Sequence, residues 1–187
     1  ELLLPPGAVS RSYLDVTIDV MQAFGVTVEG EGYERFIVKP GRCYQGRKYR
    51  VEGDYSSAAY FFAMAAVCGG RARVSSLSPA SVQGDRQFLA ALVAMGCRVS
   101  SIGDCITLES DRTLEGIEMD LSSSPDTVQT LCMVAACATS PSRFTGISHL
   151  KYKESDRILA ILSILRALGG DVTAEEDGSI SIRPVPL

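Results

Sequence analysis

Apolar residues recur at helical spacing in three segments, and each segment ends at a glycine. The apolar positions are Leu14, Ile18 and Met21 before Gly25; Phe88, Leu89, Leu92 and Val93 before Gly96; and Ile158, Ile161, Leu162, Leu165 and Leu168 before Gly169. This spacing is typical of amphipathic helices that bury one face. A glycine after the last turn is favoured because the left-handed cap conformation is strained for other residues. The pattern predicts three similar helices, with their glycines 71 and 73 residues apart.

A pair of strand-like segments follows each of these glycines. The three stretches are 26–38, 97–108 and 171–182, and their turns carry Gly-Glu-Gly, Gly-Asp and Asp-Gly. Glycine beside an acidic residue is typical of the tight turns that join antiparallel strands. We therefore expect a β-hairpin after each amphipathic helix.

Two further helices are expected to be apolar around nearly their whole circumference. They begin near Asp54 and Asp126, 72 residues apart, and strand-like stretches follow at 71–77 and 143–148. Such helices are normally buried on all sides. The repeating unit is strand, buried helix, strand, amphipathic helix and hairpin, which predicts an α/β fold of βαβαββ units.

The repeat divides the chain into three parts. Residues 53–118 and 119–187 each form one unit, whereas residues 1–52 keep only the later helix and hairpin. Because the first unit is truncated and the sequence does not begin with methionine, we expect a fragment of a longer protein. Gaps in its packing then favour self-association of the fragment, through apolar helix surface that the missing unit leaves uncovered.

Composition narrows the classes of partner. The net charge of −4 and the isoelectric point near 5.1 argue against nucleic acid or an anionic membrane as partner. Neither a signal peptide nor an apolar run of membrane-spanning length is found in the sequence. The six cysteines are scattered and there is one histidine, so a Cys/His metal site is not expected, and most cysteines are interpreted as buried apolar residues in a reducing cytoplasm.

The densest group of charges is KYKESDR at 151–157, directly before an apolar segment. If Ser155 caps the following helix, Arg157 lies in its first turn, where a cation opposes the helix dipole and an anion is favoured. If the helix begins earlier, Lys153 and Arg157 lie four residues apart on one face and repel each other. An anionic substrate would resolve either conflict, and so would a structural surface network with Glu154 and Asp156.

Other polar residues have structural explanations of their own. Asp126 is expected in a first helical turn, where a carboxylate stabilises the helix by about 0.3–1 kcal/mol, and Asp54 has the same explanation as a cap. His149 is the only histidine, and a solitary histidine is usually structural. Ser10 and Tyr13 are equally consistent with a phosphate-binding turn and with a loop that leads into a helix.

Five stretches together resemble the 5-enolpyruvylshikimate-3-phosphate synthase family, the enolpyruvyl transferases of the shikimate pathway. They are VSRSYLDVTIDVMQAFGV, VEGDYSSAAYFFAMAA, VQGDRQFLAALVAMG, MDLSSSPDTVQTL and LKYKESDRILAILSILRALGGDV. The resemblance implies a two-domain inside-out α/β fold of βαβαββ units, present here in incomplete form. Residues 1–52 would then end the first domain, and 53–118 and 119–187 would be two units of the second. The active site of the family lies in the cleft between the domains.

The resemblance also implies a reaction and its participants. The family transfers the enolpyruvyl group from phosphoenolpyruvate to the 5-hydroxyl of shikimate 3-phosphate, by addition and then elimination, without metal or other cofactor. Such chemistry needs a base, an acid and cations that hold phosphate and carboxylate groups. Asp126 matches the proton acceptor, Glu154 the group that transfers a proton at the methylene carbon, and Lys153 the lysine near the 5-hydroxyl. Arg157 matches the arginine that grips phosphoenolpyruvate.

Three further positions correspond to substrate contacts of the family. Ser10 matches a serine that binds the phosphate of shikimate 3-phosphate, and Tyr13 a tyrosine in the same pocket. His149 falls where some relatives carry asparagine. The family's lysine-rich phosphate loop, its serine-serine-glutamine site, its D-H-R-M-A motif and its late lysine are not among the 187 residues. Because these motifs are missing, we expect the fragment to have no useful activity of its own. We expect the parent enzyme to be cytoplasmic and monomeric.

Two alternatives remain at this point. UDP-N-acetylglucosamine enolpyruvyl transferase shares the repeat and the phosphoenolpyruvate chemistry, although the Lys-Glu-Ser-Asp-Arg element speaks against it. A non-catalytic repeat domain would use the same charges for stability alone. In that case, changes at Lys153, Glu154 or Arg157 would alter stability but not activity.

Overall fold

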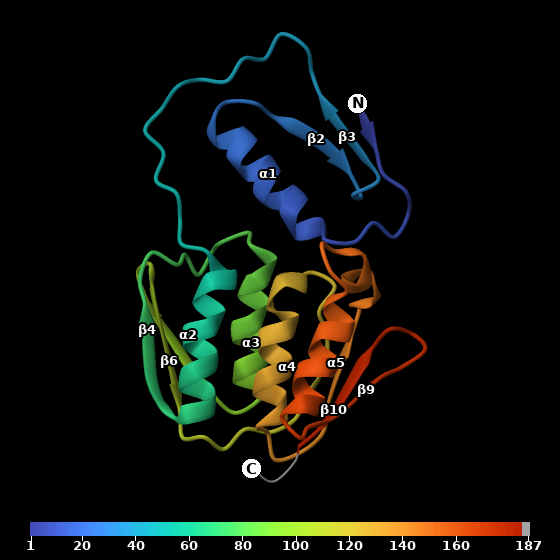
Figure 1. Ribbon diagram of the computed structural model, residues 1–187. Coiled ribbons are helices and arrows are strands. Elements are labelled where there is room, and N and C mark those ends of the chain that lie inside the picture. Colours follow the sequence, from blue (N-terminus) through green and yellow to red (C-terminus); the bar gives the residue numbers. More distant parts are fainter. Residues whose placement is uncertain (185–187) are drawn as a thin grey trace.

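The computed structural model describes residues 1–184, and it has two parts (Figure 1). The smaller part contains helix α1 (Arg11–Ala23) and an antiparallel sheet in the order β1-β3-β2. These strands are β1 (Leu2–Leu3), β2 (Val28–Glu31) and β3 (Arg35–Val38). The predicted first helix and first hairpin are therefore confirmed. Residues 42–54 then lead, without helix or strand, into the larger part.

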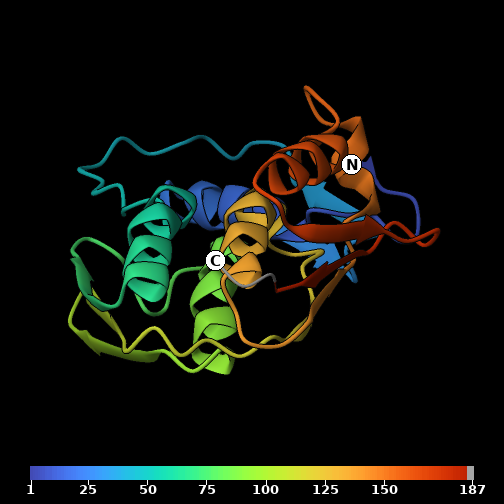
Figure 2. The ribbon, with the colours of Figure 1, turned by 60° about the horizontal axis from the view of Figure 1, so that its bottom comes forward.

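The larger part places four helices side by side between two sheets (Figures 1 and 2). The helices are α2 (Tyr55–Cys68), α3 (Gln87–Ala94), α4 (Val128–Ala136) and α5 (Arg157–Ala167). One sheet has the order β4-β6-β5, from β4 (Gly70–Val74), β5 (Arg98–Ile102) and β6 (Cys105–Ser110). The other has the order β7-β8-β10-β9, from β7 (Glu118–Asp120), β8 (Ser142–Thr145), β9 (Asp171–Ala174) and β10 (Ile180–Arg183). The predicted α/β architecture is confirmed.

One complete βαβαββ unit is formed, and a second lacks its first strand. The order β7-α4-β8-α5-β9-β10 is complete, with β7 and β8 parallel and the final hairpin antiparallel. The strand expected ahead of α2 is not formed. In its place, the Gly53 N–H donates a single hydrogen bond of 2.5 Å to the Ser76 carbonyl. The corresponding bond after β7 joins the Leu121 N–H to the Thr145 carbonyl, at 2.9 Å.

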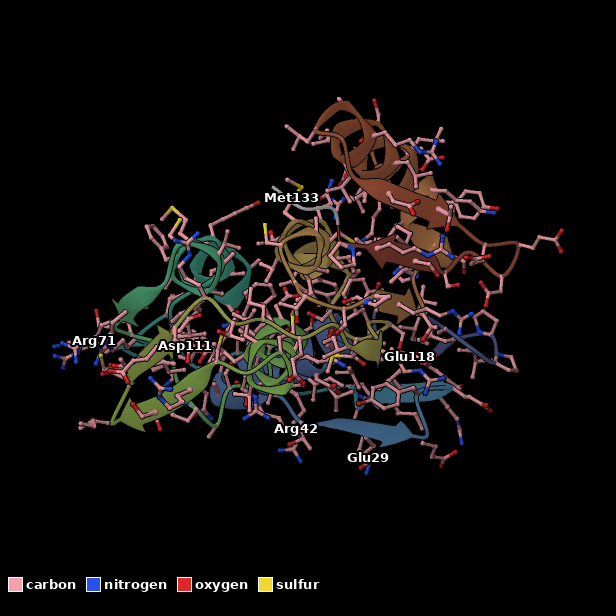
Figure 3. The ribbon with its side chains drawn as sticks, turned by 90° about the horizontal axis from the view of Figure 1, so that it is seen from below. Glu29, Arg42, Arg71, Asp111, Glu118 and Met133 are labelled. Carbon is pink, nitrogen blue, oxygen red and sulfur yellow. The ribbon has the colours of Figure 1, made fainter. Side chains whose placement is uncertain are left out.

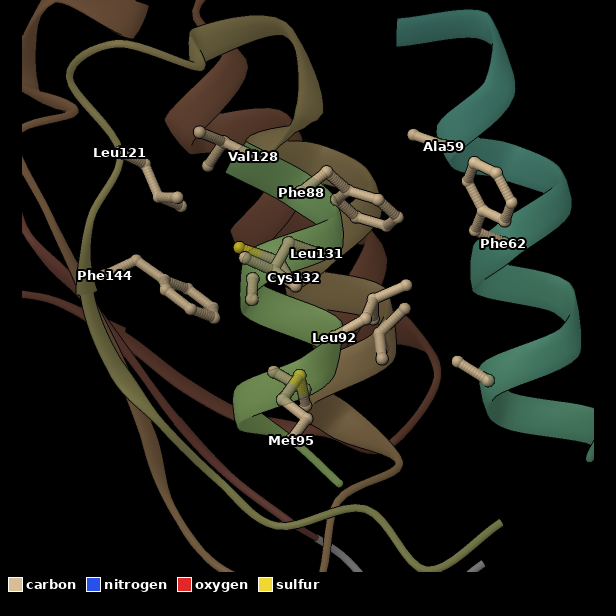
Figure 4. Close-up of a cluster of buried hydrophobic side chains, with 14 of the residues drawn as sticks. Ala59, Phe62, Phe88, Leu92, Met95, Leu121, Val128, Leu131, Cys132 and Phe144 are labelled. Carbon is tan, nitrogen blue, oxygen red and sulfur yellow. The ribbon is translucent and has the colours of Figure 1, made fainter. Parts of the chain in front are cut away.

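The core lies between the two sheets, where the four helices pack against one another and against both sheets, and Figure 4 shows the part of it around α2, α3 and α4. Phe88 and Leu92 from α3 meet Leu131 from α4, and all three are at most 1% exposed. The expectation that α2 is buried on all sides is wrong. Its outer face exposes Tyr60 (62%), Phe61 (55%) and Met64 (57%), because the described chain places no element over it.

Short turns at the helix starts set the geometry of the site. They are η1 (Gly84–Arg86) before α3, η2 (Pro125–Thr127) before α4 and η3 (Ser148–Tyr152) before α5. Asp54 caps α2, as expected, by accepting hydrogen bonds of 3.0 Å from the Ser56 and Ser57 N–H groups. The predicted cap of α5 is wrong, because Asp156 and not Ser155 accepts the Leu159 N–H. The glycines after α1, α3 and α5 have positive φ, as the left-handed cap requires.

Charged side chains project outward from both sheets, as Arg71 and Glu118 illustrate (Figure 3). The cysteines are free thiols, and the expectation that most of them are buried is wrong. Cys97 and Cys132 are buried, Cys105 and Cys137 are partly exposed, and Cys43 and Cys68 are exposed. Within residues 1–184, every helix is too short or too polar to cross a membrane.

Candidate active site

The first turns of α2, α3, α4 and α5 all lie at the end of the helical layer that faces α1 (Figure 1). Peptide dipoles give this end a positive potential, which favours anions. Asp126 is in η2, Arg157 is the first residue of α5, and Tyr13 is in the first turn of α1. The two parts of the molecule therefore meet at the charged residues singled out in the sequence.

Asp126 is the centre of this cluster. Its Oδ1 accepts a hydrogen bond of 2.7 Å from Arg157 Nη1, and its Oδ2 accepts one of 2.5 Å from the Tyr13 hydroxyl. Arg157 Nη2 also donates to Glu154 Oε2 at 3.1 Å. The Lys153 ammonium lies 5.9 Å from the centre of the Tyr13 ring. Five predicted site residues, from α1, η2, the start of α5 and the segment that leads into α5, thus share one location.

The local sequence explains why Asp126 and Arg157 face each other. Pro125 begins η2, where its fixed φ suits a first helical position, and this places Asp126 in the first turn. Asp156 caps α5, so that the helix begins at Arg157. The carboxylate of Asp156 serves the backbone, so Arg157 is neutralised by Glu154 and by the distant Asp126. A local network of Glu154 and Asp156 alone does not form.

Protonation states follow from these contacts. Burial pushes the pKa of Asp126 upward, but the hydrogen bonds from Tyr13 and Arg157, with the charges of Arg157 and Lys153, hold it below its usual range. Burial and the bond to Asp126 raise the pKa of Tyr13, so the phenol stays protonated and donates. A backbone hydrogen bond and Arg157 lower the pKa of the exposed Glu154. At neutral pH the cluster has two carboxylates, two cations and a neutral phenol.

His149 and Ser10 are placed differently. His149 is in η3, and within the described residues neither of its buried ring nitrogens has a hydrogen-bond partner. Burial and then the charge of Lys153 lower its pKa. Ser10 precedes α1 in a left-handed conformation with φ of 59°, and its side chain does not cap the helix. Neither residue makes a hydrogen bond to the Asp126 cluster within residues 1–184.

A cavity of about 350 Å³ adjoins the cluster, between α1 and the starts of α2 and η1. Asp126 and Tyr13 line it together with Asp85, which sequence reasoning did not single out. Asp85 is 7% exposed, and burial raises its pKa although Ser56 and Ser124 donate to it. One aspartate in a helical turn carries no signal of burial in the sequence. Within the described residues, three or more His, Cys, Asp or Glu side chains do not gather in a way that could hold a metal.

The fold is that of the enolpyruvyl transferases. EPSP synthase from Acinetobacter baumannii superimposes with a TM-score of 0.73 and 29% identity, over 89% of this chain and 40% of that chain. The enolpyruvyl transferase NikO from Streptomyces tendae superimposes with a TM-score of 0.66 over 91% of this chain and 40% of that one, at 17% identity, which supports the fold alone.

Sequence comparison defines the family within this class. The family model described as EPSP synthase (3-phosphoshikimate 1-carboxyvinyltransferase) matches residues 5–186. The 3-phosphoshikimate 1-carboxyvinyltransferase of Methanoculleus marisnigri is 59% identical over the whole chain, and that of Methanoregula boonei is 57% identical over 95% of it. The chain belongs to the EPSP synthase family. It spans 44% and 42% of the length of these two relatives.

Proposed function

We propose that this chain supplies part of the active site of an enzyme that transfers the enolpyruvyl group from phosphoenolpyruvate to the 5-hydroxyl of shikimate 3-phosphate. The observation that carries the proposal is the cluster of Asp126, Arg157, Glu154 and Tyr13, where the starts of η2 and α5 meet the first turn of α1. Both substrates are anions, and the helix starts and the cations favour anions at this end of the fold. Family membership supports the same reaction.

In the addition step, Asp126 accepts the proton of the 5-hydroxyl while the oxygen bonds to the central carbon of phosphoenolpyruvate. Glu154 donates a proton to the methylene carbon, which becomes a methyl group. In the elimination step, Glu154 takes back a methyl proton, the double bond re-forms and the bond to phosphate breaks. The proton held by Asp126 passes to the departing phosphate, which restores both carboxyl groups to their starting states. Lys153 stabilises charge near the bridging oxygen, and Arg157 holds phosphoenolpyruvate with a two-pronged guanidinium.

Arg157 links the two residues that exchange protons in these steps. Its guanidinium is shared between Asp126 and Glu154, and it lowers the pKa of both. An anionic substrate that draws Arg157 away would raise both pKa values. Asp126 would then be a stronger base, and Glu154 would be more readily protonated as an acid.

Substrate positioning falls to the remaining residues. Tyr13 and Ser10 contact shikimate 3-phosphate from the side of α1. His149 contacts the same substrate, because its ring nitrogens have no hydrogen-bond partners among residues 1–184 and a substrate oxygen can supply one. The neutral imidazole that its lowered pKa favours can still donate one hydrogen bond.

The wider assignments belong to the same proposal. Residues 1–52 end a first domain, and 53–118 and 119–187 are two units of a second; the three separate sheets support this division. The last three residues of the third range lie outside the described part. The complete enzyme is cytoplasmic and monomeric. The 187-residue chain alone lacks useful turnover, because it spans under half of its relatives and their further phosphate-binding motifs are not in its sequence.

Calorimetric titration of the chain with shikimate 3-phosphate and with UDP-N-acetylglucosamine tests the proposal. We expect heat of binding from shikimate 3-phosphate alone, weakened by Asp126→Asn and unchanged by Asp171→Asn, which removes only an exposed ion pair with Arg183. Binding of the nucleotide sugar instead would support the other transferase. If the aspartate equivalent to Asp126 is replaced by asparagine in the Methanoculleus marisnigri relative, a lower melting temperature with unchanged phosphate release would favour the non-catalytic alternative.

A further inference from the structure

Asp85 is a buried carboxylate whose described polar partners are hydroxyl groups. It is 7% exposed, and its two oxygens accept hydrogen bonds from Ser56 and, at 3.0 Å, from Ser124. Within residues 1–184 it forms no ion pair. Burying a carboxylate without a cation opposes folding, so its presence calls for a reason other than stability.

The two hydroxyl groups belong to the starts of two different helices. Ser56 is in the first turn of α2, and Ser124 directly precedes η2, two residues before Asp126. Ser124 is fully buried, and its hydroxyl also lies 2.6 Å from that of Thr127, which is likewise fully buried. Asp85 therefore holds the start of η2 against the start of α2 and limits where Asp126 can lie.

The residue before Asp85 packs closely against Ser12, the neighbour of Tyr13 in the sequence. A Cβ on Gly84 would lie 2.0 Å from the Ser123 carbonyl oxygen and 2.5 Å from Ser12 Oγ, so the Gly84 and Ser123 backbones and the Ser12 side chain meet without spare room. Ser12 Oγ also donates to the Ser123 carbonyl at 2.8 Å. Ser12 directly precedes Tyr13 in α1. The η1 turn thus contacts Ser12, which precedes Tyr13, and Ser124, which lies two residues before Asp126. It therefore touches the chain next to both partners of the Tyr13–Asp126 hydrogen bond.

We propose that Asp85 is a positioning residue, which through Ser124 fixes η2 so that the Asp126 carboxylate faces Tyr13 and Arg157. It acts on the proposed reaction through Asp126, without itself exchanging a proton with substrate. The proposal has one readout that is independent of any ligand and a second that rests on the proposed function.

The ligand-independent readout is the energetic coupling of Tyr13 with Asp126. A double-mutant cycle of Tyr13→Phe and Asp126→Asn is measured by urea unfolding in the parent chain and in variants of the Asp85 contacts. We expect the unfolding constants to show a coupling of about fivefold in the parent. It should fall to near onefold in Ser124→Ala and Asp85→Ala. Asp85→Asn should retain most of it, because an amide can still bond both hydroxyls.

Ser56→Ala is the matched control, since it removes the other hydroxyl and leaves the link to η2. A purely structural Asp85 predicts that Ser56→Ala and Ser124→Ala lower stability alike and leave the coupling unchanged. That result would overturn the proposal. If Asp85→Ala does not fold, Ser124→Ala still decides the matter, because it deletes a single oxygen atom.

The second readout is affinity for shikimate 3-phosphate in three glycine variants. Gly84→Ala should weaken binding by about 10- to 100-fold, because small displacements of positioned groups have effects of that size. Gly116→Ala is equally crowded, with Pro141 O at 2.1 Å, but is remote from Asp126, so it should lower stability and leave affinity unchanged. Gly46→Ala, with nothing within 4 Å, should change neither.

Equal loss of affinity in Gly84→Ala and Gly116→Ala would overturn the positioning role. Absence of binding by the parent chain would count against the proposed function instead. The coupling measurement would still decide the role of Asp85 in that event, because it uses no ligand.

Discussion

Arg157 and Asp126, 31 residues apart in the sequence, form an ion pair of 2.7 Å between the starts of α5 and η2. The Arg157 side chain is 19% exposed and also reaches Glu154 at 3.1 Å. A planar guanidinium can hold two carboxylates at once because its N–H groups point in fixed, divergent directions. Arg157 thereby holds the two acidic groups together.

Replacement of Arg157 by lysine tests this arrangement. The ammonium cannot reproduce the fork, so we expect thermal or urea unfolding to show a loss of about 1 kcal/mol, a modest value because the pair is partly exposed. Arg183→Lys is the control, since its pair with Asp171 spans 3.5 Å on the surface. Equal stability of the two variants would contradict a bridging role for Arg157.

The change of unfolding free energy with pH at acid pH should depend on Asp126. Its pKa is held below the unfolded value of about 3.9, so its contribution is complete above that value and is lost as pH falls through the lower folded pKa. Asp126→Asn should therefore flatten the rise of unfolding free energy with pH at the acid end. Urea titrations from pH 2.5 to pH 7 measure this slope.

Asp85→Asn should change the same curve in the opposite direction. Burial raises the pKa of Asp85, so the folded state binds the proton more tightly than the unfolded state does. Its contribution declines as pH rises from the unfolded pKa through the higher folded one. Asp85→Asn should therefore make the unfolding free energy rise more steeply with pH at the acid end. Parallel changes in the two variants would show that one of the two environments is misassigned.

His149 should titrate below the usual histidine range. Burial and Lys153 lower its pKa, so between the folded pKa and the unfolded value near 6.5 the unfolded state binds more protons. Stability should therefore fall as pH drops through this window. The sequence has one histidine, so its Cε1–H resonance reports the pKa by NMR without overlap from other histidines. Lys153→Met should raise the pKa of His149. Lys151→Met should leave this pKa unchanged, because the Lys151 ammonium lies over the Tyr152 ring.

The isolated chain should self-associate through the apolar groove between α2 and α4. Tyr60, Met64 and Met133 line this groove of about 610 Å³, and Met133 projects from α4 on the side away from α3 (Figure 3). Exposed apolar surface of this kind favours association in water. Sedimentation velocity should show species larger than the monomer that grow with concentration. Met64→Glu should reduce them.

Ile102→Glu serves as the control for that experiment. Ile102 is 82% exposed at the tip of the β5–β6 hairpin, away from the groove, so its change should leave association as it was. A monomer at every concentration would contradict the prediction.

Hydrophobic period, together with glycine and acidic residues at the turns, predicted the helix–hairpin repeat and the ends of the amphipathic helices. This was possible because burial of one helix face and the left-handed cap are encoded within a few neighbouring residues. Proline and aspartate likewise placed Asp126 in a first turn. The cap of α5 was misplaced by one residue, since Ser155 and Asp156 are both good caps and only the backbone path chooses between them.

Tertiary structure alone decided which charges meet. The partner of Arg157 is Asp126, and not the adjacent Asp156, because α4 and α5 pack with their starts at the same end of the layer. The burial of Asp85, the missing strand before α2 and the exposed face of that helix also depend on elements far apart in the chain. Local sequence specifies backbone conformation and the burial of a face, whereas contacts between distant side chains exist only once those faces have packed.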